Sequence, residues 1–233
     1  MRTARAARQT LTPDRVAQAA LAFIDQFGLD EFSTRRLGKE LGVEGMALYN
    51  HFESREALLD AVAEILFCQL TVPPKGPGWV ERVRTFARSY RALARMHPRA
   101  YPLLAMRRLA TERALGVINA LFSALLEEGF APPEAALAFR TVANFCNGTA
   151  LNELAIMAHL AQHPGPRAIS MARVDAYLHP AHFDAHFEAG LEMLLDGLAR
   201  RRAGHKKGKG TRRVPNGAVR RVARRRPNQT GGR

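Results

Sequence analysis

The chain has 233 residues, and 47% of them are hydrophobic, which is enough to bury the core of one large domain or two small ones. Its formal net charge of +14 comes from the C-terminal end: 14 Lys and Arg and no acidic residue follow residue 199, whereas the preceding residues hold 21 basic and 21 acidic side chains. The net charge therefore neither supports nor excludes DNA binding by the first 199 residues.

We expect an all-α fold, because apolar residues recur every three or four positions and no segment alternates over the length of a strand. The first helix has Thr12 as its N-cap, Pro13 at its first position and Gly28 at its end. Five apolar residues form the stripe that this helix is expected to bury: Val16, Ala20, Phe23, Ile24 and Phe27.

Three shorter helices are expected before residue 71. Thr34 can cap a helix that ends at Gly42. Ser54 can cap another that runs from Arg55 to about Leu70. The remaining helix lies between these two, after the short sequence GVE, so the chain folds back on itself within very few residues.

The helices on either side of GVE have the pattern of a helix-turn-helix. Leu37 and Leu41 lie one turn apart and can face the core, and Gly38 leaves space for another helix to cross closely. Gly42 tolerates a positive φ and permits a sharp turn, after which the next helix buries Leu48. In this motif the second helix lies outside the core and enters the major groove of DNA. It exposes Gly45, Met46, Ala47, Tyr49, Asn50 and His51.

A domain boundary is expected at residues 72–78, VPPKGPG, because its prolines lack the amide donor that a helix needs. Residues 1–11 are then a flexible basic arm, residues 12–71 a helix-turn-helix domain and residues 79–200 a regulatory domain. The tail, residues 201–233, has hardly an apolar anchor and is expected to be disordered.

The regulatory domain is expected to contain five helices and one loop. The loop is QHPGPRAIS, residues 162–170, with room for one short helix after it. The expected helices are Trp79–Met96, Pro98–Met106, Thr111–Glu128, Pro133–His159 and Ala181–Arg200.

The segment FSTRRLGKELGVEGMALYNHFESREALL, residues 32–59, resembles the N-terminal DNA-binding region of the TetR family of bacterial transcriptional repressors. The GVE turn, the LYNH end of the second helix and ALLDA after it are similar to the tetracycline repressor subgroup. The resemblance covers about residues 12–200 and is loose after the first seventy. It implies a DNA-binding domain followed by a helical domain for ligand binding and dimerisation, and hence a ligand-responsive repressor.

The resemblance also implies which residues contact operator DNA. Arg35 would recognise guanine, and the base-facing residues near the turn offer only backbone or apolar contact, which suits a thymine methyl and implies a distinct operator. Phosphate contacts would come from the end of the second helix and from Arg55. The full implied set is Thr34, Arg35, Glu44, Gly45, Met46, Ala47, Tyr49, Asn50, His51 and Arg55. Tyr49 has a simpler alternative as a packing residue, and Arg35 as a solvated charge.

The first seventy residues hold eight basic and ten acidic side chains, so positive charge for DNA binding must be local. One group is the arm, with Arg2, Arg5 and Arg8, which can follow the minor groove. The other lies on one short helix and comprises Arg35, Arg36 and Lys39.

In the family, two helices of the regulatory domain form a four-helix dimer bundle, and the resemblance places them at the Pro133–His159 and Ala181–Arg200 helices. The expected dimer contacts are Gly190, Leu191, Leu194, Leu195, Gly197 and Leu198. An intramolecular core uses the same apolar stripe and remains the alternative. The inducer pocket is expected to be lined by Phe86, Tyr90, Tyr101, Met106, Asn144, Asn147 and Leu151, although such residues also form ordinary cores.

The magnesium–tetracycline site of the subgroup requires histidines and a glutamate. At the corresponding positions this chain has Thr71, Leu104, Asn144 and Asn152. We therefore expect a less polar inducer than magnesium–tetracycline, and no cofactor.

Two alternatives remain open. A nucleoid-type protein would bind DNA through its Arg-rich tail without sequence preference. A metal-binding helical enzyme would use His182 and His186, four residues apart on one helix face, for which the sequence places no third ligand.

Several features argue against other classes. Cys68 and Cys146 lack the spacing of a disulfide framework or a zinc site. There is no GxSxG, phosphate loop or carboxylate pair that indicates catalysis. No apolar run spans a membrane and residues 1–10 precede no signal-peptide core. We expect a cytoplasmic protein that is not an enzyme and has no membrane partner.

Overall fold

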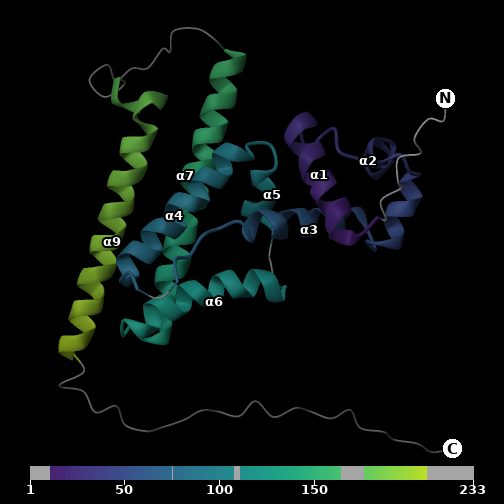
Figure 1. Ribbon diagram of the computed structural model, residues 1–233. Coiled ribbons are helices and arrows are strands. Elements are labelled where there is room, and N and C mark those ends of the chain that lie inside the picture. Colours follow the sequence, from purple (N-terminus) through teal and green to yellow (C-terminus); the bar gives the residue numbers. More distant parts are fainter. Residues whose placement is uncertain (1–10, 75, 108–110, 164–175, 209–233) are drawn as a thin grey trace, which may run out of the picture.

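The computed structural model describes residues 11–74, 76–107, 111–163 and 176–208, and these residues contain helices and no strand. The arm arginines, most of the predicted loop and the tail from residue 209 lie outside the described residues. A small helical head lies at one side of the molecule, and longer helices form the rest (Figure 1). None of the helices in the described ranges is both long enough and apolar enough to cross a lipid bilayer.

The head contains α1, α2, a 3-10 helix and α3, and its caps explain where each begins. Thr12 accepts a hydrogen bond from the amide of Arg15, and Ser54 accepts one from the amide of Ala57, as their cap roles predict. The cap of α2 is Ser33 rather than Thr34, since the Ser33 hydroxyl accepts the amide of Arg36. The elements are α1 (Pro13–Phe27), α2 (Thr34–Leu41), η1 (Gly45–Asn50) and α3 (Arg55–Phe67).

The core of the head confirms four members of the predicted α1 stripe and corrects the fifth. Phe27 is 38% exposed, whereas the other four are buried. The Phe27 ring lies at the edge of the core, with its centroid 4.8 Å from that of the buried Phe23 ring and 5.8 Å from the Arg36 guanidinium. Leu37 and Leu48 are fully buried and fix α2 and η1 against the other helices.

The regulatory domain is built around α4 and α7, which pack together along their length (Figure 1). Gly78 precedes α4, and residues 72–74 before it are not helical. Its elements are α4 (Trp79–Met96), α5 (Tyr101–Met106), α6 (Glu112–Glu127), α7 (Pro132–Gln162), η2 (Ala176–Leu178), η3 (Pro180–His182) and α9 (Phe183–Gly208).

Several helix boundaries differ from the prediction by one to eight residues, and for two of them a contact explains the difference. The helix expected from Pro98 begins at Tyr101, because the preceding turn closes through a hydrogen bond from the amide of Ala100 to the carbonyl of His97. The last helix continues to Gly208, beyond the expected end at Arg200, so the predicted tail begins inside α9. Arg202 pairs with Glu128 at 3.2 Å and lies over the Phe130 ring, which holds this extension against α6.

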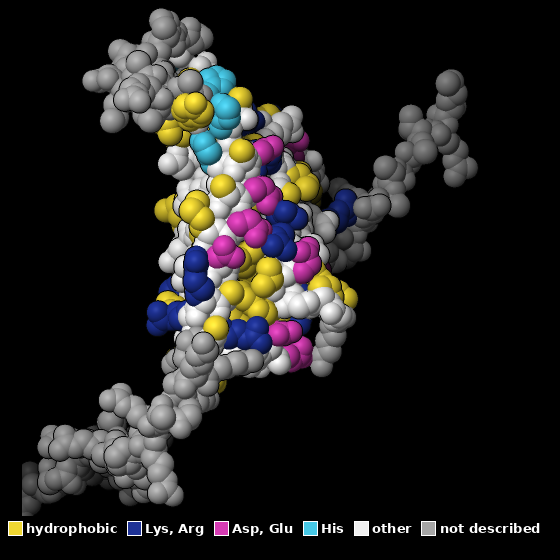
Figure 2. All heavy atoms as spheres, turned by 90° about the vertical axis from the view of Figure 1, so that its left-hand side faces the viewer, with side chains coloured by type: hydrophobic (Ala, Val, Ile, Leu, Met, Phe, Trp, Pro, Cys, Tyr) yellow, Lys and Arg dark blue, Asp and Glu magenta, His cyan; other side chains and the backbone are white. Residues whose placement is uncertain are grey.

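A row of ion pairs joins α4 to α9. Arg84 binds Glu192 with Nε–Oε1 of 2.8 Å, and Arg88 binds Glu188 with Nη2–Oε2 of 2.8 Å. Arg91 completes the row with Nη1 2.9 Å from a carboxylate oxygen of Asp184. Residue numbers rise along α4 while those of their partners fall along α9, so the two helices are antiparallel. Figure 2 shows basic and acidic side chains side by side along one edge of the α9 face.

Candidate DNA-binding surface and ligand cavity

The helix-turn-helix is held by a crossing of two backbones. A Cβ atom on Gly38 would lie 2.8 Å from the amide nitrogen of Gly45 and 2.9 Å from the carbonyl oxygen of Val43. A Cβ on Gly45 would lie 2.9 Å from the Cα of Arg35. Neither position has room for a side chain, because the obstacle is backbone that cannot rotate away. The crossing predicted for Gly38 is confirmed, and the reciprocal role of Gly45 was not predicted.

Gly42 makes the turn between the two helices. It has φ of 68° and ψ of 30°, the left-handed conformation that glycine adopts without a steric penalty. Its amide donates to the carbonyls of Gly38 and Lys39, which ends α2. The turn brings the start of η1 beside the start of α2.

η1 presents one face to solvent and one to the core. Met46 is 71% exposed and Tyr49 is 40% exposed, whereas Leu48 is buried. Glu44 and Asn50 are exposed, and Gly45, Ala47 and His51 are half-buried. The Tyr49 hydroxyl lies 3.4 Å from the hydroxyl of Thr34, which links η1 to α2 rather than to α1. The element predicted as a second helix is thus a short 3-10 helix with an exposed outer face.

Three arginines of the head have different surroundings. Arg36 pairs with Glu31 and lies 5.4 Å from the Phe23 ring centroid, so it is part of the head's own structure. Arg55 lies 5.6 Å from the Phe32 ring centroid and pairs with Glu56. Arg35 is exposed, and it makes no ion pair or ring contact with the residues that the structure describes. Of the three, Arg35 is the one that makes neither an ion pair nor a ring contact within the described part of the chain.

The regulatory domain meets the head through the packing of α3 against α5 and α6 and through several polar side chains, two sets of which are described here. Arg107, after α5, pairs with Glu56 and Asp60 on α3 and donates to the Glu56 carbonyl at 3.1 Å. The hydrogen bond from Arg107 lowers the pKa of the Glu56 carboxyl. At the end of α4, His97 Nδ1 lies 2.7 Å from a carboxylate oxygen of Asp25 on α1. Neither contact was predicted, because nothing in the local sequence of these residues indicates a partner 47 to 72 positions away.

The residues predicted to line an inducer pocket are mostly packed together. Phe86, Tyr90 and Tyr101 are buried, with successive ring centroids 5.4 and 6.2 Å apart in edge arrangements. The Tyr101 hydroxyl donates to Asn147 Oδ1 at 2.9 Å. Burial raises the pKa of both tyrosines, so both stay neutral hydrogen-bonding groups. In this structure these side chains fill the interior.

The other predicted pocket residues do not join this cluster as a cavity wall. Met106 is 81% exposed, Asn144 is exposed one turn before Asn147, and Leu151 is half-buried. Met106 was misplaced by the prediction because α5 ends there and its last side chain faces outward. Among the four positions that correspond to the magnesium–tetracycline site, Leu104 is buried, and Asn144 and Asn152 are exposed on α7.

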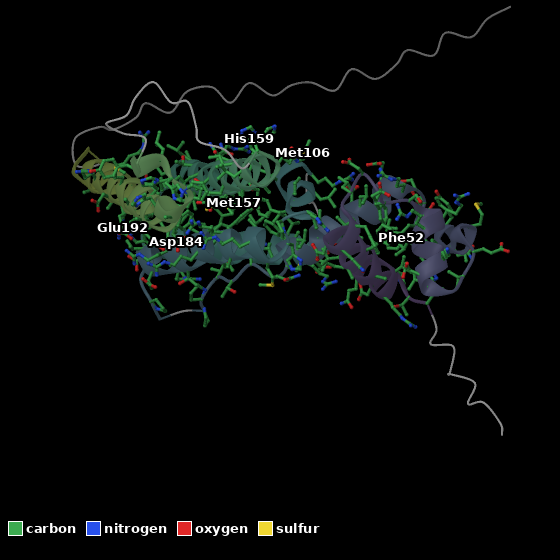
Figure 3. The ribbon with its side chains drawn as sticks, turned by 90° about the horizontal axis from the view of Figure 1, so that it is seen from above. Phe52, Met106, Met157, His159, Asp184 and Glu192 are labelled. Carbon is green, nitrogen blue, oxygen red and sulfur yellow. The ribbon has the colours of Figure 1, made fainter. Side chains whose placement is uncertain are left out.

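A cavity of about 620 Å³ lies elsewhere, between α4, α7 and the segment that begins α9. Its wall includes Arg91, Glu153, Met157 and Phe183 and none of the residues predicted for the inducer pocket. A second hollow of about 480 Å³ lies between α7 and α9, against Asn152 and His186. Figure 3 shows Met157 among the helices of the regulatory domain, between Asp184 and the head that contains Phe52.

Most of the residues predicted for dimer contact face the chain's own core. Leu191, Leu195 and Leu198 are buried within the single chain, and a Cβ on Gly190 would lie 2.9 Å from the Phe145 ring of α7. For these residues the alternative of an intramolecular core is the correct one. Leu194 is half-buried and Gly197 is exposed. The stripe was misassigned because the same periodicity serves a core and an interface.

Of the histidine pair considered for metal binding, His182 ends η3 and His186 lies in the first turn of α9, so the two are not on one helix as predicted. The His182 and His186 rings have centroids 6.0 Å apart. Within the described parts of the chain, no third His, Cys, Asp or Glu completes a metal-binding group around this pair.

Comparison with known proteins identifies the two domains. The family model described as "Bacterial regulatory proteins, tetR family" matches residues 17–62, and "Tetracyclin repressor-like, C-terminal domain" matches residues 72–202. The tetracycline repressor protein class A from transposon 1721 of Escherichia coli is 33% identical over 208 residues, which are 82% of this chain and 92% of that protein.

Two solved structures share the fold. TetR from Acinetobacter baumannii AYE has a TM-score of 0.69 at 28% identity, covering 83% of this chain and 99% of that chain. ActR from Streptomyces coelicolor in complex with actinorhodin has a TM-score of 0.69 at 27% identity, with the same coverage. The named relatives are regulators rather than enzymes. With a head built on a helix-turn-helix, a helical second domain and these matches, the chain belongs to the TetR family of DNA-binding transcriptional repressors.

Proposed function

We propose that this protein is a homodimeric repressor that binds a palindromic operator and is released from it by a small-molecule inducer. The observation that carries the proposal is the exposed guanidinium of Arg35 beside the outer face of η1. Arg35 and Met46 lie on the two helices that the Gly38–Gly45 crossing brings together. An arginine in this position can donate two hydrogen bonds to O6 and N7 of guanine, and Met46 suits a thymine methyl.

The phosphate contacts follow from the same surface. Tyr49 keeps its hydroxyl near Thr34 while 40% of its surface is exposed, so both hydroxyls can reach a phosphate oxygen. His51 follows at the end of η1. Arg55 is held over Phe32, and 41% of its side chain is exposed. These groups would set the register of the head on DNA without selecting sequence.

Dimerisation is proposed through the outer faces of α7 and α9, in place of the buried leucines. The outer face of α9 lies opposite its buried stripe, and uncharged residues recur along it every four positions. α7 has a similar uncharged stripe. Figure 2, which looks onto this side, shows uncharged surface between groups of charged side chains. The stripe residues are Leu137, Thr141, Asn144, Gly148, Asn152, Ala155, Ala185, Ala189, Met193 and Gly197. Two heads in such a dimer would reach half-sites about 34 Å apart, one turn of DNA.

The inducer is proposed to be an uncharged or weakly polar molecule. The relatives include proteins whose solved complexes hold actinorhodin, or anhydrotetracycline with magnesium. Leu104 and the exposed asparagines of α7 do not offer the imidazole and carboxylate ligands that a magnesium complex needs. We therefore propose an inducer that binds without a metal ion.

The DNA-binding proposal is tested with two adjacent arginines. Arg35→Ala should weaken binding to the operator by about 1–3 kcal/mol, roughly 5- to 150-fold, because a bidentate base contact is lost. Its melting temperature should not change. Arg36→Ala should lower the melting temperature, because Arg36 contacts Glu31 and Phe23. Fluorescence anisotropy with the promoter duplex and a scrambled duplex measures the first effect. Equal affinity of the parent protein for both duplexes would contradict the proposal.

The dimer is tested by Met193→Glu, which places a charge in the proposed interface. Sedimentation equilibrium should give a monomer for this variant and a dimer for the parent chain. Met106→Glu, an exposed methionine on α5, is the matched control and should remain dimeric. A dimer that withstands Met193→Glu would require another interface.

The second candidate, a nucleoid-type protein, is separated by deleting residues 209–233. The repressor keeps its preference for the promoter over scrambled DNA and loses some salt-dependent affinity. A protein that binds through its tail would lose DNA binding altogether.

A further inference from the structure

We propose that the cavity between α4, α7 and the start of α9 binds an uncharged, largely apolar small molecule. The assignment of this cavity to the inducer rests on the proposed repressor function. The proposal that the cavity binds a small molecule depends only on its geometry. Its volume of about 620 Å³ falls within the range of about 300–1,000 Å³ that small-molecule sites occupy.

The alternative location is already filled. The residues predicted to line an inducer pocket include Phe86, Tyr90 and Tyr101, which pack edge to edge, and the Tyr101 hydroxyl donates to Asn147. A ligand placed there would have to displace buried aromatic side chains. The cavity beyond the end of this cluster is open without any such displacement.

The charges at the cavity are paired with one another. Arg91 is 8% exposed and binds Glu153 through Nε and Nη2, with the shortest distance 2.8 Å. Its remaining Nη1 reaches Asp184 at 2.9 Å, and Arg95 also pairs with Asp184. A charged ligand would have to break one of these pairs and leave the other partner buried, which is costly. The paired charges therefore select an uncharged ligand.

The rest of the wall is apolar, with one adaptable side chain and one polar group. Met157 is 53% exposed at the cavity and its thioether side chain can adjust to the shape of a ligand. His179 Nδ1 accepts the amide of Ala181 at 3.2 Å, so in the neutral ring Nε2 carries the proton and can donate to a ligand oxygen. Besides Met157, the apolar lining residues are Ala94, Ala150, Leu154, Pro180, Ala181 and Phe183.

The cavity shares a helix with the contact to the head. Arg91, Ala94 and Arg95 of α4 lie in its wall, and α4 ends at Met96. The next residue, His97, is the one that contacts Asp25 of α1. A ligand that shifts the end of α4 would therefore act directly on the position of the head.

The test uses the full-length protein and the uncharged fluorescent probe N-phenyl-1-naphthylamine. Ala181→Trp narrows the cavity and should weaken probe binding about tenfold, which is 1.4 kcal/mol. Ala136→Trp, at an exposed alanine on α7 outside the cavity wall, is its control and should bind like the parent. Met157→Gln should weaken binding by a smaller factor, and Met106→Gln should have no effect. Circular dichroism melting confirms that each variant is folded.

The outcomes separate the inference from the proposed function. Probe binding that survives Ala181→Trp and Met157→Gln, or that is lost only in Met106→Gln, would overturn the cavity site. Binding that appears only when the protein is diluted to monomers would mean that a second copy fills the cavity, and would also overturn it. Loss of promoter preference in the anisotropy experiment, with the probe pattern intact, would reject the repressor while retaining the site.

Discussion

The head and the regulatory domain are held together by different kinds of contact. In the head, α2 and η1 cross with backbone against backbone at Gly38 and Gly45, and fully buried leucines fill the space behind them. In the regulatory domain, arginines of α4 reach across to carboxylates of α7 and α9. The backbone crossing cannot change its spacing, because no side chain lies between the two backbones to adjust. The ion pairs use long side chains that can follow a helix as it shifts, which suits a domain that responds to a ligand.

The largest expected effect lies in the regulatory domain, at its buried ion pair. Arg91→Met should destabilise the protein by about 3–5 kcal/mol, because it leaves the carboxylate of Glu153 buried without its bidentate partner. Arg88→Met removes an exposed pair with Glu188 and should cost less than about 1 kcal/mol. Urea denaturation of both variants measures the difference. Equal losses would mean that burial does not distinguish the two pairs.

The next effect lies in the head. Gly38→Ala should destabilise it by about 1–3 kcal/mol and reduce promoter affinity, because the added methyl group meets the backbone of Gly45. Gly116→Ala, in α6 with no atom within 4 Å of the new Cβ, should instead stabilise the protein by about 0.5–1 kcal/mol. Thermal melting checks both signs. A neutral Gly38→Ala would show that the crossing has room to open.

A smaller effect is expected from acid on the α4–α9 row. Hydrogen bonds from Arg95 and Arg84 lower the pKa values of Asp184 and Glu192, respectively. A carboxyl with a lowered folded-state pKa contributes stability above its unfolded value of about 4, and that contribution is lost as pH falls through the folded value. The melting temperature should therefore fall as the pH is lowered from 5 to 3, and less steeply in Glu192→Gln. Identical slopes would argue that the pair with Arg84 adds nothing.

The smallest expected effect is a difference in the rates at which the two cysteine thiols are modified, one in each region. Burial raises the pKa of Cys146 to about 12, and it also raises that of the half-buried Cys68 at the end of α3. Because the thiolate is the reactive form, iodoacetamide at pH 8 should modify Cys68 slowly and Cys146 only after unfolding. Peptide mass spectrometry with and without urea distinguishes the sites. Equal modification of both in the folded protein would indicate that α7 opens readily.

Much of the head was predictable because its signals are local. Thr12, Gly28, Gly42 and Ser54 each end or begin a helix within a few residues of where the sequence places them. The exposed face of η1 follows from the turn that precedes it. The role of Gly45 as the second half of a backbone crossing was missed, because a short turn does not reveal how closely two backbones approach.

By itself, the sequence determined the helical fold of the described residues and a helix-turn-helix with Arg35 on its outer surface. Periodicity and capping act over one or two turns, so the residues concerned are all neighbours in the chain. Only the tertiary structure decided that Leu191 and Leu195 face inward, that Arg91 meets Glu153, and that the open cavity lies beside Met157 instead of Tyr101. Those outcomes depend on which faces of α4, α7 and α9 meet, and a helical stripe has the same pattern whether it packs within a chain or between chains.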